Sequence, residues 1–181
     1  MTLPGLLGAV DRLGRRALGA ALDNARTSTA AISEQVRLRQ ALAPADDDDD
    51  PGALVRLDRA TCLELLASRR TGRLAYVARP GVPDVVPVNI ALDGGRLLVR
   101  SGPGPKLQAA ERREVVAVEV DDIDEGSRTG WSVVVAGRAR RLHTSEAAAL
   151  PDDLLPEVWA RGPRSSVIAI ELTRVEGRRL A

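Results

Sequence analysis

The spacing of apolar residues changes character along the chain. Over residues 3–22, leucines and a valine recur at helical spacing, but four glycines interrupt them. Each interior glycine lowers helix stability by about 1 kcal/mol relative to alanine. The pattern predicts a marginal amphipathic helix, which is either a partly ordered tail or an adaptor that docks on a partner or a membrane surface.

A charged interruption follows this helix. Five consecutive aspartates, Asp46 to Asp50, stand between Pro44 and Pro51. Because the carboxylates repel one another and proline breaks helices, the run predicts a solvated linker. We therefore expect an N-terminal helical tail over 1–45, an acidic linker over 46–52 and a folded domain over 53–181.

After the linker, the pattern predicts a helix and then a sheet. Asp58 is an N-cap candidate before apolar residues at helical spacing, and Gly72 is the expected stop signal. From Arg73 the period falls to two, and the residues from Asp93 to Gly95 indicate a hairpin turn. Strands are expected over 73–78, 83–92, 96–101, 115–121, 130–142 and 165–177, with helices within 102–114 and over 145–161.

These expected elements define a fold class. A sheet this long and apolar must bury one face and protect its edges. We therefore expect a mainly β fold with short helices (α+β), built as a six-stranded antiparallel barrel that is closed or half closed.

Composition narrows the class of partner. Apolar residues make up 44% of the chain and aromatics only 2%, so aliphatic side chains must fill the core. The net charge is +1 with both signs interspersed, unlike the basic stripe of a nucleic-acid-binding protein. The sequence contains no long apolar run, and its single cysteine, Cys62, has no disulfide partner in the chain. We expect a cytoplasmic protein with no membrane span and no nucleic-acid partner.

The loop after residues 96–101 is the first candidate site. Arg100 and Ser101 end the strand, two glycines and two prolines shape the loop, and Lys106, the single lysine among 26 basic residues, opens the next helix. Backbone amides, a hydroxyl and cations in one loop suit a phosphate group. The spacing is not that of a Walker loop, and the alternative is an ordinary Gly/Pro loop that contains a lysine.

The strand over 83–92 contains Pro87 and Asn89. Proline cannot donate to a β-ladder, so we expect an edge or a bulge near Pro87. Free backbone groups at that place are then able to face a ligand. The alternative is a simple edge strand.

The strand over 130–142 begins with an indole. Alternation places Trp131 and Val133 on one face and Ser132 on the other. The indole is either a core or interface residue or a cap for a planar ring.

Metal chemistry has little support in the sequence. His143 is the single histidine, and no cysteine is near it in sequence. The acidic segment 119–130 lacks the ligand spacing of a calcium loop, so we interpret it as a solvated turn. We expect no metal site.

Several segments, taken in order, resemble the pyridoxamine 5'-phosphate oxidase-like superfamily of flavin-binding split β-barrels. That superfamily also contains nitroimidazole-resistance proteins and deazaflavin-dependent reductases. The matching segments lie within 53–181 and are GRLAYV, DVVPVNIALDGGRLLVRSGPGPKLQA, VAVEVDDID, TGWSVVVAGRARRL and VIAIELTRVEGRRL.

The resemblance implies a homodimer of FMN-binding split barrels, with the cofactor in a groove at the subunit interface. The cofactor-binding residues that it implies are Val88, Asn89, Arg100, Ser101, Lys106, Trp131 and Ser132. The first two would line the flavin ring through backbone groups, and the next three would hold the phosphate. The last two would approach the flavin from the partner subunit.

The same resemblance implies a flavin-dependent oxidoreductase that acts on a small molecule, although no residue is identified as catalytic. The chain lacks the paired Arg and Lys of true pyridoxamine phosphate oxidases, where VVPVNI stands, and lacks their C-terminal substrate segment. Oxidation of vitamin B6 is therefore not expected. Two alternatives remain: a deazaflavin coenzyme in place of FMN, and a non-catalytic module that binds or sequesters a flavin, a deazaflavin or haem. The small number of acid and base groups favours the second alternative.

Overall fold

In a computed structural model of the protein, the described residues are Arg37, Gln40 and the ranges 54–79, 81–159 and 164–180. These residues form eight strands, three α-helices and one short 3₁₀ helix. The strands are β1 (Leu54–Leu57), β2 (Thr71–Arg79), β3 (Val82–Asp93), β4 (Arg96–Ser101), β5 (Val115–Asp124), β6 (Thr129–Arg141), β7 (Ser166–Glu171) and β8 (Arg174–Leu180). The helices are α2 (Arg59–Ala67), α3 (Pro105–Glu111), α4 (Thr144–Ala148) and the 3₁₀ helix η1 (Asp152–Leu154).

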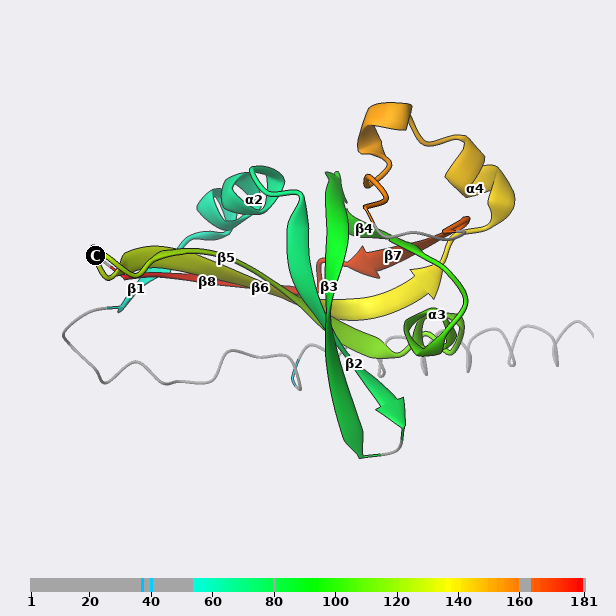
Figure 1. Cartoon of the computed structure of the whole chain (residues 1–181), viewed down its shortest axis with the longest axis horizontal. Coiled ribbons are helices and arrows are strands. Elements are labelled where there is room, and N and C mark those ends of the chain that lie inside the picture. The colour runs from blue at the N-terminus through cyan, green and yellow to red at the C-terminus, as the bar shows by residue number, and fades with distance from the viewer. Residues whose placement is uncertain (1–36, 38–39, 41–53, 80, 160–163, 181) are drawn as a thin grey trace, which may run out of the picture. The chain divides into compact units, whose positions relative to one another are not determined.

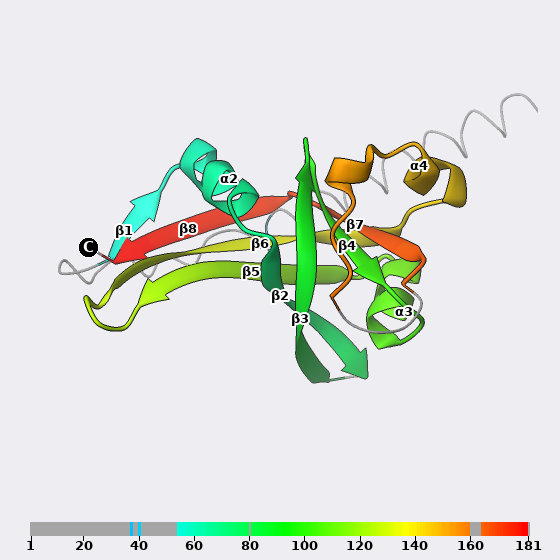
Figure 2. The ribbon, with the colours of Figure 1, turned by 45° about the horizontal axis from the view of Figure 1, so that its top comes forward.

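The strands close into a barrel. Their order is β1-β8-β6-β5-β2-β3-β4-β7, and β7 also pairs with β6. A ring of six strands, β6-β5-β2-β3-β4-β7, therefore returns to its first member, and β8 and β1 extend the sheet outward from β6 (Figures 1 and 2). The pairings are antiparallel, so the expectation of a mainly β fold with a six-stranded antiparallel barrel is confirmed. The short strand β1 was not expected.

Two long strands belong to both halves of the barrel. Strand β3 pairs with β2 as far as Asn89 and with β4 from Ile90 onward. Strand β6 pairs with β8 as far as Ala136 and with β7 from Ala139 onward. Between these segments of β6 lies Gly137, where an added Cβ would overlap the backbone carbonyl of Glu171. Because Gly137 has no side chain, the end of β7 at Glu171 is able to pass directly over β6 there.

This crossing corrects one expectation. The single last strand expected over 165–177 is two strands, β7 and β8, separated by Leu172 and Thr173. Apolar residues continue from β7 into β8, and the sequence has no strong break signal at Leu172 and Thr173. The pattern of one strand cannot show that its two halves pair with different parts of β6.

Aliphatic side chains fill the barrel, as the composition required. The largest fully buried members of the main core are Leu66, Leu74, Ile90, Leu97, Val99, Val118, Val120, Val135, Ile168 and Ile170. A second cluster lies on the other face of β4 and β7 and consists of Leu98, Leu142, Val167 and Ala169, with Ala147, Leu150 and Leu155 packed against it. The segment from α4 through η1 therefore covers an outer face of the barrel.

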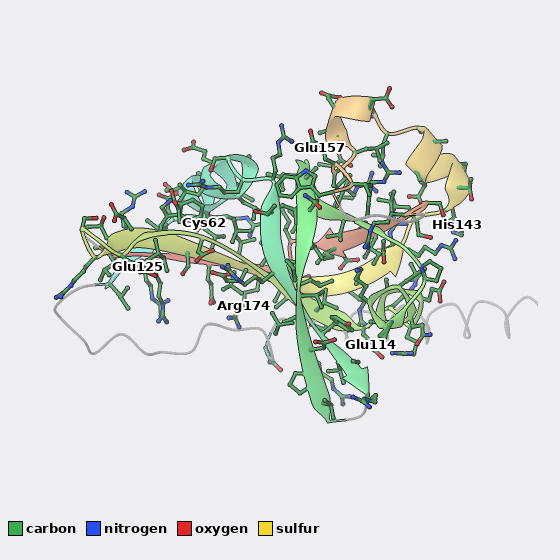
Figure 3. All side chains as sticks on the ribbon, viewed as in Figure 1. Cys62, Glu114, Glu125, His143, Glu157 and Arg174 are labelled. Carbon is green, nitrogen blue, oxygen red and sulfur yellow. The ribbon has the colours of Figure 1, made fainter. Side chains whose placement is uncertain are left out.

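The helix α2 confirms its expected start but not its expected end. The carboxylate of Asp58 accepts a hydrogen bond from the Thr61 backbone N–H at 2.9 Å, which is an N-cap. The helix ends at Ala67, and Gly72 lies instead within β2, where an added Cβ would come within 2.8 Å of the Glu119 carbonyl oxygen. Gly72 therefore allows β2 and β5 to pack closely. Cys62 is fully buried between α2 and β8, as an ordinary core thiol (Figure 3).

The helix expected over 145–161 is wrong in most of its length. Helix α4 ends at Ala148, η1 forms a single turn, and residues 155–159 have no regular helix. Pro151 and Pro156 explain the difference, because each lacks an N–H and excludes the helical conformation of the residue before it.

The tail expected over 1–45 and the linker over 46–52 lie outside the described residues, apart from Arg37 and Gln40. Their boundaries stay predictions. Within the part of the chain that the structure describes, no helix is both long and apolar enough to cross a membrane.

Candidate functional site

Three separate parts of the chain converge at the end of β4. Ser101 pairs with Ser166 in the ladder between β4 and β7, which brings Arg164, two residues before β7, beside the end of β4. The Arg100 Nε donates a hydrogen bond to the Arg164 backbone oxygen at 3.2 Å. Lys106 lies in the first turn of α3, directly after the loop that leaves β4.

The turn between β4 and α3 depends on one glycine. Gly104 has φ of +144°, a conformation that L side chains rarely adopt, and nothing lies within 4 Å of a Cβ added there. Pro105 occupies the first position of α3, where its missing N–H costs no intrahelical bond. The Gly/Pro composition of this loop therefore fixes where α3 begins and places Lys106 in its first turn.

The converging side chains carry positive charge without compensation. Burial lowers the pKa of Lys106, and the positive charge of Arg164 lowers it further. Among the described residues, Arg100, Lys106 and Arg164 form no ion pair with a carboxylate. The Nε of Arg164 is also buried without a hydrogen-bond partner. We call these residues the cation cluster.

Asn89 lies next to this cluster. The last register pair of β3 and β4 at this end is Ile90 with Val99, so Asn89 and Arg100 are the next opposite residues and share a face of the sheet. The amide Nδ2 of Asn89 is buried without a hydrogen-bond partner. A buried donor without a partner carries a free-energy cost, which a polar group of a ligand would offset.

Strand β3 has the open edge near Pro87 that the proline predicted. On the side away from β2, residues 82–89 have no paired strand among the described strands, so the backbone at Pro87 lies on an open edge. The Val88 side chain is buried in the main core. Only its backbone is therefore available to a ligand.

The Ser101 hydroxyl does not point freely into the loop as a hydrogen-bond donor for a phosphate would. Its side chain is fully buried, and its hydroxyl donates to the backbone oxygen of Gly102 at 2.8 Å. The hydroxyl proton is therefore engaged within the loop.

Trp131 and Ser132 lie elsewhere in the chain. A shallow pocket of about 290 Å³ is lined by Leu54, Ile123, Thr129, Gly130, Trp131, Ser132, Arg178 and Leu180. None of these lining residues belongs to the cation cluster. The Trp131 ring packs against the main core, and the Arg69 guanidinium, which pairs with Asp122, lies 5.6 Å from its centroid. One chain therefore does not bring Trp131 or Ser132 into the cation cluster.

Sequence reasoning missed Arg164. The residue lies in a Gly/Pro-containing loop, and its partner Arg100 is 64 positions earlier in the chain. No local pattern distinguishes it from the other arginines. The signal that finds it is the strand register of β4 and β7.

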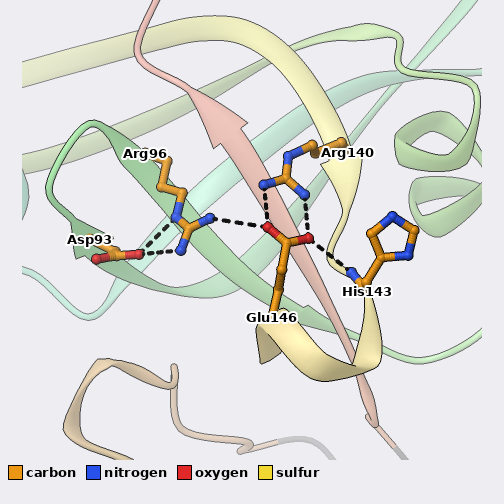
Figure 4. A network of polar contacts seen from close by, with 5 residues as sticks. All are labelled: Asp93, Arg96, Arg140, His143 and Glu146. Atoms are coloured by element: carbon orange, nitrogen blue, oxygen red, sulfur yellow. Dashed lines mark hydrogen bonds and ion pairs between the residues drawn. The ribbon is translucent and has the colours of Figure 1, made fainter. Parts of the chain in front are cut away.

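A second charged group lies at the other end of β4, and its charges are balanced. Both terminal nitrogens of Arg140 donate to the Glu146 carboxylate at 2.8 Å, and the Arg96 Nε donates to Asp93 at 2.7 Å (Figure 4). An Arg96 nitrogen is 4.0 Å from Glu146, which joins the two pairs. We call these residues the balanced network.

The balanced network includes the backbone of the single histidine. The backbone N–H of His143 donates to Glu146 at 3.2 Å, in front of α4. Arg140 first, and this backbone bond second, lower the pKa of Glu146 from 4.5 to about 2. Among the described residues, no group of three or more His, Cys, Asp or Glu is arranged to hold a metal ion.

Comparison with known proteins agrees with the barrel. The family model described as pyridoxamine 5'-phosphate oxidase matches residues 58–179. An uncharacterized protein of Mycobacterium tuberculosis is 38% identical over 132 residues, which cover 70% of this chain and 86% of that protein.

Solved structures are similar as well. A FAD-binding protein from Mesorhizobium loti is 31% identical with a TM-score of 0.61, covering 71% of this chain and 99% of that chain. The FAD-binding protein from Mycobacterium smegmatis is 26% identical with a TM-score of 0.53, covering 71% of this chain and 100% of that chain. Because the family model matches residues 58–179, the chain belongs to the pyridoxamine 5'-phosphate oxidase-like family.

Proposed function

We propose that the protein binds a flavin cofactor whose phosphate lies against Arg100, Lys106 and Arg164. The observation that carries this proposal is the uncompensated cation cluster. Cations held together without a carboxylate repel one another, and a bound dianion removes that cost and gains charge-assisted hydrogen bonds. The FAD-binding proteins among the similar structures support the same class of cofactor.

The neutral groups of the site fit this cofactor. The buried Nδ2 of Asn89 is a free donor on the face of Arg100 and would meet a polar atom of the flavin. Backbone groups of Val88 and Asn89, at the open edge of β3, would line the ring. The Ser101 hydroxyl donates its one proton to Gly102, and it would donate to the phosphate only by turning that proton away from the Gly102 oxygen.

We further propose a homodimer with the cofactor at its interface. Trp131 and Ser132 lie outside the cation cluster of their own chain, so they would reach the flavin from a second copy. Sedimentation of the flavin-loaded protein tests this arrangement. We expect a dimer, and a monomer that retains full flavin affinity would contradict it.

The proposed activity is that of an oxidoreductase on a small molecule other than pyridoxamine 5'-phosphate. A bound flavin supplies hydride or electron chemistry. The chain's own residues anchor the phosphate, orient the ring through the β3 backbone and exclude water. FMN is the proposed cofactor, and titrations with FMN, FAD and a deazaflavin coenzyme would compare it directly with the alternatives.

One observation favours a second candidate, a module that carries flavin without turnover. The proposed contacts comprise cations, an amide, a hydroxyl and an indole, and among these described residues there is no carboxylate or imidazole to act as acid or base. Reduction of the bound flavin by a nicotinamide donor, followed by reoxidation that depends on an added substrate, would support the oxidoreductase. Flavin that binds but never turns over would support the carrier.

The absorbance spectrum of the purified protein, with mass spectrometry of any released cofactor, tests flavin binding first. A colourless protein that does not quench FMN fluorescence at micromolar concentrations would refute it. Substitution Lys106→Gln then tests the phosphate site. We expect an FMN affinity lower by about 10-fold or more, with riboflavin affinity unchanged because riboflavin has no phosphate.

The matched control is Arg141→Gln. This change removes the same charge from an exposed residue that pairs with Glu111 rather than with the cluster. FMN affinity should stay near that of the unchanged protein. If both variants lost FMN affinity equally, the loss would reflect the overall charge of the protein and not a phosphate site at Lys106.

A further inference from the structure

The chain contains three aromatic side chains, one tyrosine and two tryptophans. Tyr76 is 7% exposed, and its hydroxyl donates to Asp84 at 2.9 Å. Trp131 is partly buried against the core and beneath Arg69. Trp159 is different, because 64% of it is exposed. Its ring is therefore the one largely exposed aromatic surface of the protein.

The ring of Trp159 is held rather than loose. Its Nε1–H donates to the carboxylate of Glu157 at 2.9 Å, which restrains rotation of the indole. Earlier in the same segment, Leu155 packs against the second cluster, and Pro156, directly before Glu157, is buried. The backbone before the indole is thus anchored, while most of the indole itself is exposed.

The segment that leads to Trp159 runs close to β3, the strand that carries Asn89 (Figures 1 and 2). η1 contacts β3, and the segment after η1 runs beside β3 in both ribbon views (Figures 1 and 2). Glu157, the hydrogen-bond partner of the indole, lies near the upper part of β3 in Figure 3. Strand β3 carries Asn89, whose side chain shares a face with Arg100.

Trp159 is also near Arg164 in sequence. The two residues are five positions apart, so their Cα atoms are separated by at most about 17 Å. An anchor for a phosphate and an exposed ring therefore belong to one short stretch of chain, at a separation that one flavin molecule can bridge.

We propose that Trp159 stacks on the planar ring of the cofactor and is a ring-positioning residue of the same site. This inference rests on the proposed function. Stacking would cover the exposed indole, and the Glu157 bond would fix its orientation before binding, which lowers the entropy lost on association.

The test compares Trp159→Ala with Trp159→Phe, using riboflavin and FMN as fluorescent probes and inorganic phosphate as a competitor. For Trp159→Ala we expect affinity for riboflavin and for FMN to fall about tenfold, with weaker quenching of flavin fluorescence. Trp159→Phe keeps a ring and should recover most of both. Phosphate competition should be unchanged, because the cation cluster is intact.

The matched control is Val158→Ala, a change of the neighbouring exposed residue. It should leave both affinities unchanged. If Trp159→Ala binds riboflavin as tightly as the unchanged protein, the stacking role is wrong while the phosphate site stands. If the unchanged protein binds neither flavin, the proposed function fails, and this inference fails with it.

Discussion

Strand β4 carries two arginines on one face, and the two have opposite surroundings. Arg96, at the start of β4, meets Asp93 and belongs to the balanced network. Arg100, at the end of the strand, donates to the backbone oxygen of Arg164, and the strand register, continued by one residue, places Asn89 opposite it. The same residue type on the same face thus has a carboxylate at one end and additional cations at the other.

This difference separates a structural role from a binding role. In the balanced network, the chain supplies the anions, so the charges are satisfied on folding and leave little for a ligand. In the cation cluster, no carboxylate among the described residues neutralises the cations. The folded protein therefore attracts an anionic ligand to this place. Perturbed, uncompensated charge in a partly buried place is a signal of function.

The largest expected effect comes from making the two regions alike. Substitution Asn89→Asp places a carboxylate opposite Arg100, at the position where the cluster lacks one. We expect FMN affinity to fall about 100-fold or more, because the new anion repels the phosphate and pairs with the cations. The melting temperature of the unliganded protein should rise. Fluorescence titration and thermal unfolding measure the two effects.

The control for this change is Asn89→Ser, which removes the amide without adding charge. It should lower FMN affinity only a few-fold. A loss as large as that of Asn89→Asp would assign the effect to the missing amide rather than to charge.

A paired substitution on one strand gives the next effect. Arg100→Gln should lower FMN affinity about tenfold and leave the unfolding free energy nearly unchanged. Arg96→Gln should do the reverse, lowering the unfolding free energy by about 0.5–1 kcal/mol because its ion pairs are partly exposed, with FMN affinity intact. Urea unfolding and FMN titration of both variants measure this exchange. Equal effects of the two variants on either quantity would erase the distinction between the two regions.

The smallest expected effect is a dependence on pH. The pKa of Glu146 is lowered from 4.5 to about 2 in the folded chain, so its contribution to stability is full above pH 4.5 and is lost as the pH falls toward 2. The unchanged protein should therefore lose more stability across this window than Glu146→Gln. Parallel acid-unfolding curves for the two proteins would contradict the role of Glu146.

The sequence predicted the elements of the fold better than their connections. Alternation located the strands, and Asp58 located the start of α2, because both signals are local. The break between β7 and β8 and the closure of the ring depend on how β6 pairs with both. Such pairing joins residues far apart in sequence, and no period of apolar residues records it.

The candidate site shows the same limit. Lys106 was a candidate from its loop, since glycine, proline and a single lysine stand together there, and its role at the cofactor stays a prediction. Arg164 was not found, because only the register of Ser101 with Ser166 brings it to the loop. Trp159 was expected inside a helix, whereas the prolines around it place it in an irregular segment with an exposed ring. The roles of Trp131 and Ser132 at the cofactor stay predictions.

The chemical rarity of Lys106 has a practical consequence. Because it is the single lysine, the chain offers one side-chain amine, and it lies in the cation cluster. Burial and the charge of Arg164 lower its pKa, so a larger fraction of this amine is unprotonated at a given pH than in an ordinary lysine. An acylating reagent therefore has one side-chain amine as its target, and acylation of that amine would remove a charge from the cluster.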